Sequence, residues 1–183
     1  MIGFFGGSFD PIHNGHLNLA VQLKENAGLE KVLFCPTFIS PFKAEKQAAH
    51  AKHRLKMIEM AIHGAPGFEL IDLEIKREGK SYTIDTIQEL QKQYHQPFRL
   101  LLGEDQWAGF PQWKEAEKLI SLAPPLVGRR GAGGTPFAVD IPLFDISSTE
   151  IRARVKAGQW VGHLVPEQVS EYILTQGLYL NGS

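Results

Sequence analysis

An apolar run that ends in two glycines and then leads into a helical pattern constrains this chain more than any other feature. Residues 2–5 are apolar, Gly6 and Gly7 follow, and an apolar helical periodicity begins near Gly15. A strand that passes through glycines into a helix points backbone N–H groups, and the positive end of the helix dipole, at the turn. The segment therefore predicts a phosphate-binding site at the start of an α/β fold.

Two histidines lie at the mouth of the same helix. His13 and His16 are three residues apart, and their rings are donors that suit the charge on a transferring phosphate. Two other interpretations compete with this one. The glycines could form only a tight turn with surface histidines beside it, or the pair could bind zinc. Zinc usually needs a third protein ligand, and the single cysteine, Cys35, lies in a strand-like run.

Length and charge favour one globular domain over residues 1–183. The net charge of −1 gives no basic surface for nucleic acid, and 43% hydrophobic residues is an ordinary content. The chain shows neither a signal-peptide pattern at its start nor an apolar stretch of about 18 residues that could span a membrane. We therefore expect a cytoplasmic protein that binds neither nucleic acid nor membrane. The sequence does not indicate its oligomeric state.

Short apolar runs alternate with helical patterns along the whole chain, which is the order of a parallel sheet covered by helices. We predict an α/β, Rossmann-like, doubly wound parallel sheet with helices on both faces, whose ligands lie beyond the carboxyl ends of the strands. The predicted strands are 2–5, 31–35, 68–73, 98–102, 125–127 and 141–143. Helices are predicted to begin near Gly15, His50, Thr83, Gln112 and Ser148, with a last one over 166–175.

Two motifs carry a resemblance to a known family. Residues 6–16 resemble the (H/T)-x-G-H motif of the nucleotidylyltransferase superfamily, and in their long form they resemble the bacterial nicotinate-nucleotide adenylyltransferases. Residues 146–152, Ile-Ser-Ser-Thr-Glu-Ile-Arg, are similar to the I-S-x-T-x-I-R segment of the same enzymes. With intermediate matches, the resemblance extends over nearly the whole chain, and it implies a fold of the nucleotidylyltransferase type.

The resemblance implies a set of residues that act on the phosphates of ATP. Lys43 follows a proline-rich loop, where the neighbouring Phe42 replaces a histidine that is common in the family. Taken alone, Ser147 and Glu150 have the spacing of a helix capping box, so a purely structural role is also available to them. The implied catalytic residues are His13, His16, Lys43 and Arg152, and the implied ATP- and phosphate-binding residues are Gly6, Gly7, Ser8, Phe9, Asp10, Gly15, Ser147, Ser148 and Thr149.

Two further elements resemble the site for the second substrate. Residues 81–86, Ser-Tyr-Thr-Ile-Asp-Thr, match an S-Y-T-x-x-T element, and residues 103–113 match a G-x-D…F-x-x-W arrangement. Taken alone, residues 81–86 could simply open a helix, with Ser81 or Thr83 as its cap. Trp113, in the second element, could be a core residue. The residues implied to bind the mononucleotide are Ser81, Tyr82, Thr83, Asp105, Trp113 and Lys114.

Two other cationic positions are further candidates. Arg54, in the helix after the proline-rich loop, is a possible phosphate contact, and Arg129 is a possible adenine-side contact. Gly79-Lys80-Ser81 is not a P-loop, because Glu74 stands where the first glycine belongs and no strand leads directly into the turn.

The implied reaction joins ATP and nicotinate mononucleotide to give nicotinate adenine dinucleotide and pyrophosphate. Mg²⁺ is expected to be held mainly through the substrate phosphates, with no metal-ligand set on the protein. Three alternatives stay open at this point. The acceptor could be nicotinamide mononucleotide or phosphopantetheine, or the chain could be a nucleotide-sensing module without turnover.

Overall fold

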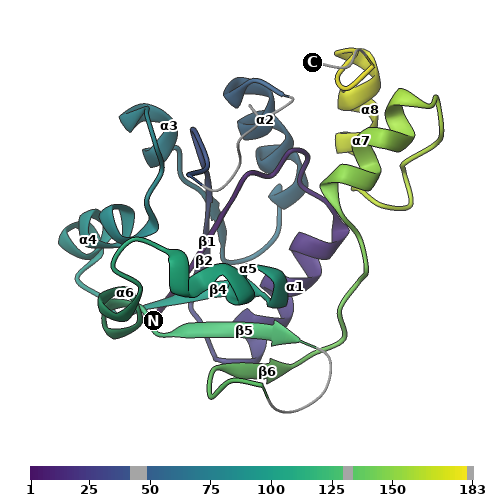
Figure 1. The fold of residues 1–183 in the computed structure, drawn as a ribbon. Helices are drawn as coiled ribbons and strands as arrows, with labels where there is room; N and C mark the ends of the chain where they lie inside the picture. Colours follow the sequence, from purple (N-terminus) through teal and green to yellow (C-terminus); the bar gives the residue numbers. More distant parts are fainter. Residues whose placement is uncertain (42–48, 130–133, 181–183) are drawn as a thin grey trace.

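A six-stranded, wholly parallel sheet forms the centre of the protein in the computed structural model, which describes residues 1–41, 49–129 and 134–180 (Figure 1). The strand order is β3-β2-β1-β4-β5-β6. From the outer β3 to β6, the bounds are Phe68–Leu70, Lys31–Pro36, Ile2–Gly7, Phe98–Gly103, Pro125–Arg129 and Ala138–Asp140. The chain runs outward from β1 to β3 and then returns to β4, so the strand order reverses between β1 and β4. Ligands bind at such a reversal, beyond the carboxyl ends of the strands.

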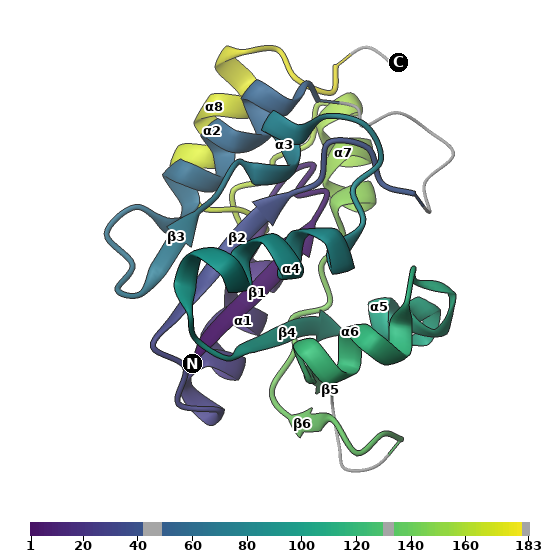
Figure 2. The same ribbon diagram turned by 90° about the vertical axis from the view of Figure 1, so that its left-hand side faces the viewer.

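Helices cover both faces of this sheet, as the sequence predicts (Figure 2). One face packs against α1, α2, α7 and α8, and the other packs against α4, the 3₁₀ turn η1 and α6. The helices are α1 (Asn14–Asn26), α2 (Ala51–Ile62), α3 (Leu73–Arg77), α4 (Thr83–Tyr94), α5 (Glu104–Gly109), η1 (Phe110–Gln112), α6 (Ala116–Leu122), α7 (Ser148–Lys156) and α8 (Glu167–Thr175).

Alternation along the strands produces the two apolar layers. On β1, Phe4 packs with the α4 side and Phe5 packs with the α1 side, and on β4 Leu100 and Leu101 divide in the same way. Successive side chains on a strand point to opposite faces, so a strand covered on both faces reads as a nearly continuous apolar run. This pattern places the sheet in the middle of the fold with both of its faces covered.

The structure differs from the predicted elements at three places. The strand predicted over 68–73 stops at Leu70, and α3 begins at Leu73. The strand predicted over 141–143 is wrong, since β6 is Ala138–Asp140. The helix predicted near Gln112 begins only at Ala116, after the unpredicted α5 and η1. All three lie where elements are short, and apolar periodicity carries little information over three to six residues.

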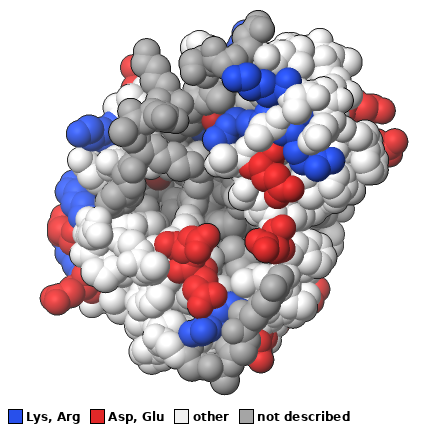
Figure 3. Space-filling view, turned by 45° about the vertical axis from the view of Figure 1, so that its right-hand side comes forward, with Lys and Arg blue, Asp and Glu red and all other residues white. Residues whose placement is uncertain are grey.

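The sequence carries nearly balanced charge, with 19 Lys and Arg against 20 Asp and Glu. On the face drawn in Figure 3, acidic and basic side chains form small groups that adjoin one another. Within the described parts of the chain, no helix has both the length and the apolar character needed to cross a bilayer.

Candidate active site

A pocket of about 520 Å³ opens beyond the carboxyl ends of the central strands. We call it the central pocket. Its walls come from the end of β1, the loop after β2, the start of α4, and the segment from α5 to α6. The sequence-predicted residues that line it are Gly6, Gly7, Ser8, Phe9, His16, Ser81, Tyr82, Thr83, Asp105, Trp113, Lys114 and Ser148. The structure thus brings parts of both predicted substrate regions to one cavity, whereas the predicted residues His13, Gly15, Ser147, Thr149 and Arg152 are not among its lining residues.

The two histidines hold each other at the start of α1. His13 is the N-cap residue, and its Nδ1 accepts a hydrogen bond of 3.3 Å from the His16 backbone N–H. In return, Nδ1 of His16 accepts one of 3.2 Å from the His13 backbone N–H. The rings stack with their centroids 3.6 Å apart. This reciprocal pattern is a capping box made from imidazoles, which positions both rings through the helix start itself.

The same hydrogen bonds determine which ring nitrogen carries the proton. Because Nδ1 is the acceptor on both rings, a neutral imidazole at either position carries its proton on Nε2 and can donate it to a ligand. Burial lowers the pKa of His13 to about 4, so this ring is neutral near pH 7. The pair therefore offers N–H donors to an anion without requiring a charged His13.

The second motif, residues 146–152, contacts the first motif, residues 6–16, although more than 130 residues separate the contacting positions in the sequence. The Ser148 hydroxyl donates to the Pro11 carbonyl at 3.0 Å, and Nη1 of Arg152 donates to the Asp10 carbonyl at 2.8 Å. Nη2 of Arg152 also lies 3.4 Å from Oγ1 of Thr149. Ser147 caps α7 by accepting from the Glu150 N–H at 3.1 Å, so the capping interpretation is confirmed for this residue. The start of α7 is thereby attached to the loop between β1 and α1.

A buried polar network supports that loop from beneath. The Asp10 carboxylate is 4% exposed, and its Oδ1 accepts from the Tyr179 hydroxyl at 2.7 Å and from the Ala49 N–H at 3.2 Å. Arg54 is 1% exposed and donates to the Ser8 carbonyl at 2.8 Å and the Ala49 carbonyl at 3.3 Å. Burial and the neighbouring Asp10 carboxylate raise the pKa of Tyr179, so its hydroxyl keeps the donated proton.

This network changes the interpretation of two predicted residues. The weak prediction that Arg54 contacts phosphate fits the structure poorly, because its guanidinium is enclosed and bound to main-chain carbonyls. Asp10 does not line the central pocket, and its carboxylate instead joins the β1–α1 loop to the start of α2 and to Tyr179. Gly15 lies beside the His13 ring. Lys43 and Phe42 lie outside the described residues.

The wall opposite the histidines is built from the start of α4. Tyr82 is the N-cap and makes no side-chain cap, so the predicted capping by Ser81 or Thr83 is wrong. Ser81 instead accepts a hydrogen bond of 2.9 Å from the Phe38 N–H, which attaches this wall to the loop after β2. Trp113 lies beside Phe110, with ring centroids 5.1 Å apart, and also lines the pocket. An aromatic surface and the amino end of a helix therefore line the same cavity.

Ten of the described lining residues are not among those predicted from the sequence, and Glu74 and Gln106 are two polar examples. Glu74 is 2% exposed; its Oε1 accepts from the Thr86 hydroxyl at 2.8 Å, whereas Oε2 has no hydrogen-bond partner among the described residues. Burial raises the pKa of this carboxyl group. Gln106 accepts from the Gly103 N–H and donates toward the Gly6 carbonyl. Its spacing of three from Gly103 is a capping signal that the sequence does contain, whereas nothing in the sequence distinguishes Glu74.

Arg129 lies at the end of β5 and does not line the central pocket. Its guanidinium forms an ion pair with Glu104, 3.3 Å between Nη2 and Oε1. The described residues also contain no group of three or more His, Cys, Asp or Glu side chains that could hold a metal ion. As far as the described residues form it, the site consists of hydrogen-bond donors, helix termini and aromatic surfaces.

Comparison with known proteins identifies the family. The family model described as cytidylyltransferase-like matches residues 4–154. A Bacillus subtilis protein named nicotinate-nucleotide adenylyltransferase is 37% identical, covering 97% of both chains. One from Dictyoglomus thermophilum, named "Probable nicotinate-nucleotide adenylyltransferase", is 40% identical over 98% of this chain and 99% of its own.

The fold has solved counterparts as well. The Plasmodium falciparum nicotinic acid mononucleotide adenylyltransferase complexed with NaAD superimposes with a TM-score of 0.78, covering 99% of this chain and 98% of its own, at 20% identity. At that identity the likeness concerns the fold, whereas the near-full-length sequence matches concern the family. This chain belongs to the nicotinate-nucleotide adenylyltransferase family of cytidylyltransferase-like proteins.

Proposed function

We propose that this protein transfers the adenylyl group of ATP to nicotinate mononucleotide, giving nicotinate adenine dinucleotide and pyrophosphate in NAD biosynthesis. One observation carries the proposal. A single pocket of about 520 Å³ joins a strand–glycine–helix phosphate loop, with His16 on its wall and His13 stacked against His16, to an aromatic wall and a helix start. The relatives that match nearly the whole chain carry the name of this activity. The proposed location is the cytoplasm, and the proposed unit is one domain over residues 1–183.

The chemistry is a direct displacement at the α-phosphorus of ATP. A phosphate oxygen of the mononucleotide attacks this phosphorus in line, the bond to the bridging oxygen of the β-phosphate breaks, and pyrophosphate leaves. The attacking phosphate is already anionic at neutral pH, so no protein nucleophile is required. Such a reaction depends on positioning and on stabilisation of negative charge.

The histidine pair supplies the donors at the reacting phosphates. His13 and His16 would donate from Nε2, since Nδ1 of each is occupied by the other residue's main chain. Ser148 and the amino end of α7 lie at the same side of the pocket, where backbone N–H groups favour phosphate. Arg152 supplies a positive charge beside Asp10 and Thr149. Lys43 is proposed to add a second cation, on the strength of the family motif alone.

The opposite wall would receive the mononucleotide. Trp113 offers a flat face to the pyridine ring, and the first turn of α4 offers N–H groups and a positive dipole end to the pyridine carboxylate. Asp105 lies on the pocket wall in the first turn of α5, where it could accept hydrogen bonds from ribose hydroxyls. The main chain of Lys114 is the proposed second contact to the carboxylate.

Mg²⁺ is proposed to arrive with ATP, bound mainly by phosphate oxygens and water, and to neutralise part of their charge. Asp10 is directed into its own buried network, so we assign it to loop positioning.

The proposal is tested by incubating the protein with ATP, Mg²⁺ and one acceptor at a time, at equal concentration. Product is identified by chromatography and mass, and pyrophosphate is measured in parallel. We expect nicotinate adenine dinucleotide to form fastest. Preference for nicotinamide mononucleotide or phosphopantetheine would overturn the acceptor assignment, and ATP binding without turnover on any acceptor would favour the sensing module.

A further inference from the structure

The central pocket has few charged side chains for a site that takes two anionic substrates. Glu74 and Asp105 contribute carboxyl groups, and Lys114 is the single Lys or Arg among the described residues that line it. The Lys114 side chain is therefore the one fixed positive charge that this part of the wall can offer. The groups that contact Lys114 determine how strongly its positive charge acts on an incoming ligand.

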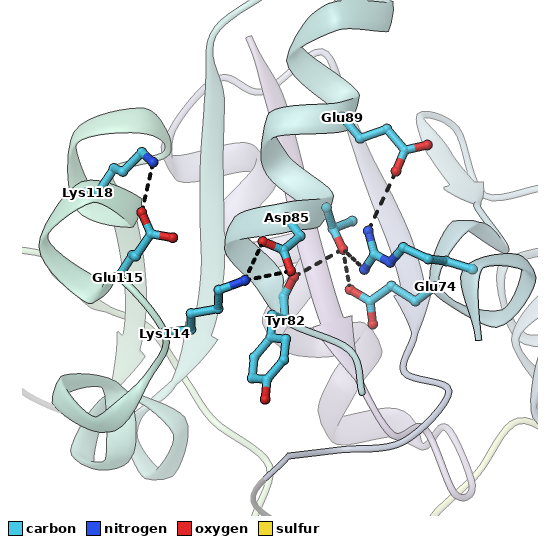
Figure 4. Close-up of polar contacts among 9 residues, drawn as sticks. Glu74, Tyr82, Asp85, Glu89, Lys114, Glu115 and Lys118 are labelled. Carbon is cyan, nitrogen blue, oxygen red and sulfur yellow. Dashed lines mark hydrogen bonds and ion pairs between the residues drawn. The ribbon is translucent and has the colours of Figure 1, made fainter. Parts of the chain in front are cut away.

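Lys114 is already paired, and its partner stands at the start of α4. Its Nζ lies 2.9 Å and 3.0 Å from the two carboxylate oxygens of Asp85, and 4.9 Å from the centre of the Tyr82 ring (Figure 4). Lys114 precedes α6, whereas Tyr82 and Asp85 belong to the amino end of α4. The three residues thus join the two elements that form the acceptor wall of the pocket.

Asp85 has an electrostatic effect of its own on that wall. It is the third residue of α4, and a carboxylate in the first turn lowers the positive potential that the free N–H groups and the helix dipole create. An unpaired Asp85 would therefore oppose a second anion at the same helix start. The bidentate contact with Lys114 cancels this charge locally, and Tyr82 holds the ammonium group over the pocket wall.

We propose that the Lys114–Asp85 ion pair determines how strongly the central pocket prefers an acceptor with an anionic ring substituent over its neutral amide. The inference rests on the proposed function and concerns a side-chain pair, distinct from any main-chain contact of Lys114. With the pair intact, the start of α4 keeps its attraction for a carboxylate. Removal of the Lys114 charge weakens that attraction, and removal of the Asp85 charge strengthens it.

Three variants separate the charges. Lys114→Met leaves Asp85 unpaired, Asp85→Asn leaves the ammonium unpaired, and the double variant has neither charge. We expect the preference for nicotinate over nicotinamide mononucleotide, as the ratio of kcat/KM values, to follow the order Asp85→Asn, then wild type and double variant together, then Lys114→Met. Both side chains are about two-fifths exposed, so steps of about two- to fivefold are expected, as for a partly solvated pair.

The acceptor ratio isolates the effect. Both acceptors carry the same phosphate and ribose, so any general loss of folding, ATP binding or phosphate chemistry cancels. The chain also supplies a matched control, because Lys118 forms a 2.7 Å ion pair with Glu115 and neither residue lines the pocket (Figure 4). Lys118→Met removes one exposed cation from the same region and should leave the ratio unchanged.

The experiment measures kcat and KM for both acceptors in all five proteins at low ionic strength, and repeats the ratio at about 0.5 M salt. The expected order, with steps that shrink in salt, supports the inference. A wild-type enzyme that prefers nicotinate mononucleotide, with a ratio unchanged in Lys114→Met or altered equally by Lys118→Met, overturns it. A wild-type protein that does not adenylylate either mononucleotide contradicts the proposed function instead.

Discussion

Replacement of Tyr179 by phenylalanine tests the buried network beneath the phosphate loop. The change removes one hydroxyl, which donates to Oδ1 of Asp10 at 2.7 Å in a setting where both side chains are more than nine-tenths buried. A hydrogen bond to a charged group contributes roughly 1.5–3 kcal/mol, and its loss leaves a buried carboxylate oxygen with one donor fewer. For a chain of this length, that loss corresponds to a fall in Tm of roughly 3–12 °C.

The effect should also reach the reaction, since Asp10 belongs to the loop that holds His13 and that accepts from Arg152. We expect a higher KM for ATP in Tyr179→Phe, with the acceptor ratio unchanged.

Urea unfolding followed by circular dichroism, together with steady-state kinetics, measures both effects. Tyr172→Phe is the matched control, because its hydroxyl contacts Nδ1 of His53 at 2.9 Å at a partly exposed site, where the loss should stay below about 1 kcal/mol. Equal losses of stability in the two variants, or an unchanged KM for ATP in Tyr179→Phe, would refute the positioning of the loop through Asp10.

Three further predictions concern the histidines and the backbone. Because the folded pKa of His13 is about 4, below its unfolded value near 6.5, the unfolded chain binds the proton first as pH falls. The stability that depends on a neutral His13 is complete above about pH 6.5 and is lost between there and about pH 4, with a size of about 2–4 kcal/mol. Urea unfolding at both pH values should therefore show a smaller loss of stability in His13→Asn, which keeps a capping group, than in the wild type. Equal losses in the two proteins would contradict the assigned burial of His13. His16→Ala should lower kcat by about a hundredfold or more with an unchanged circular dichroism spectrum, as for one lost preorganised donor, and near-normal turnover would remove its assigned role. Gly67→Ala should cost more stability than Gly64→Ala, because both positions have positive φ but only the first would bring a Cβ to 2.9 Å from a backbone oxygen, that of Glu30; equal Tm values would show that the loop shifts freely.

The parts of the fold that the sequence predicts well are those with a strong, local physical signal. The β1–glycine–α1 segment and the start of α4 at Thr83 are confirmed, because in both places an apolar helical period begins after glycine and polar residues. The sequence alone predicts β6 three residues too late, since both 138–140 and 141–143 contain β-prone apolar residues. Only pairing with β5 distinguishes them, and that pairing is a long-range property.

The candidate site shows the same division. Most predicted residues line one pocket because the carboxyl ends of parallel strands meet at one edge. The partners of Asp10 could not be predicted, because Tyr179 and Ala49 are remote in sequence and have no motif of their own. The buried role of Arg54 is not predictable from the sequence for a related reason. A cation after a phosphate loop is usually exposed, and only the packed structure shows that its charge is used by main-chain carbonyls.

The stereochemical course at the α-phosphorus tests direct transfer most closely. ATP made chiral at this phosphorus with sulfur and oxygen isotopes would be reacted with nicotinate mononucleotide, and the configuration of the dinucleotide product determined by ³¹P NMR. A single in-line attack by the mononucleotide phosphate, with His13 and His16 acting only as donors, predicts inversion. Retention would require two displacements through a covalent adenylyl-protein and would contradict the assignment of this pocket as a site that works by positioning alone.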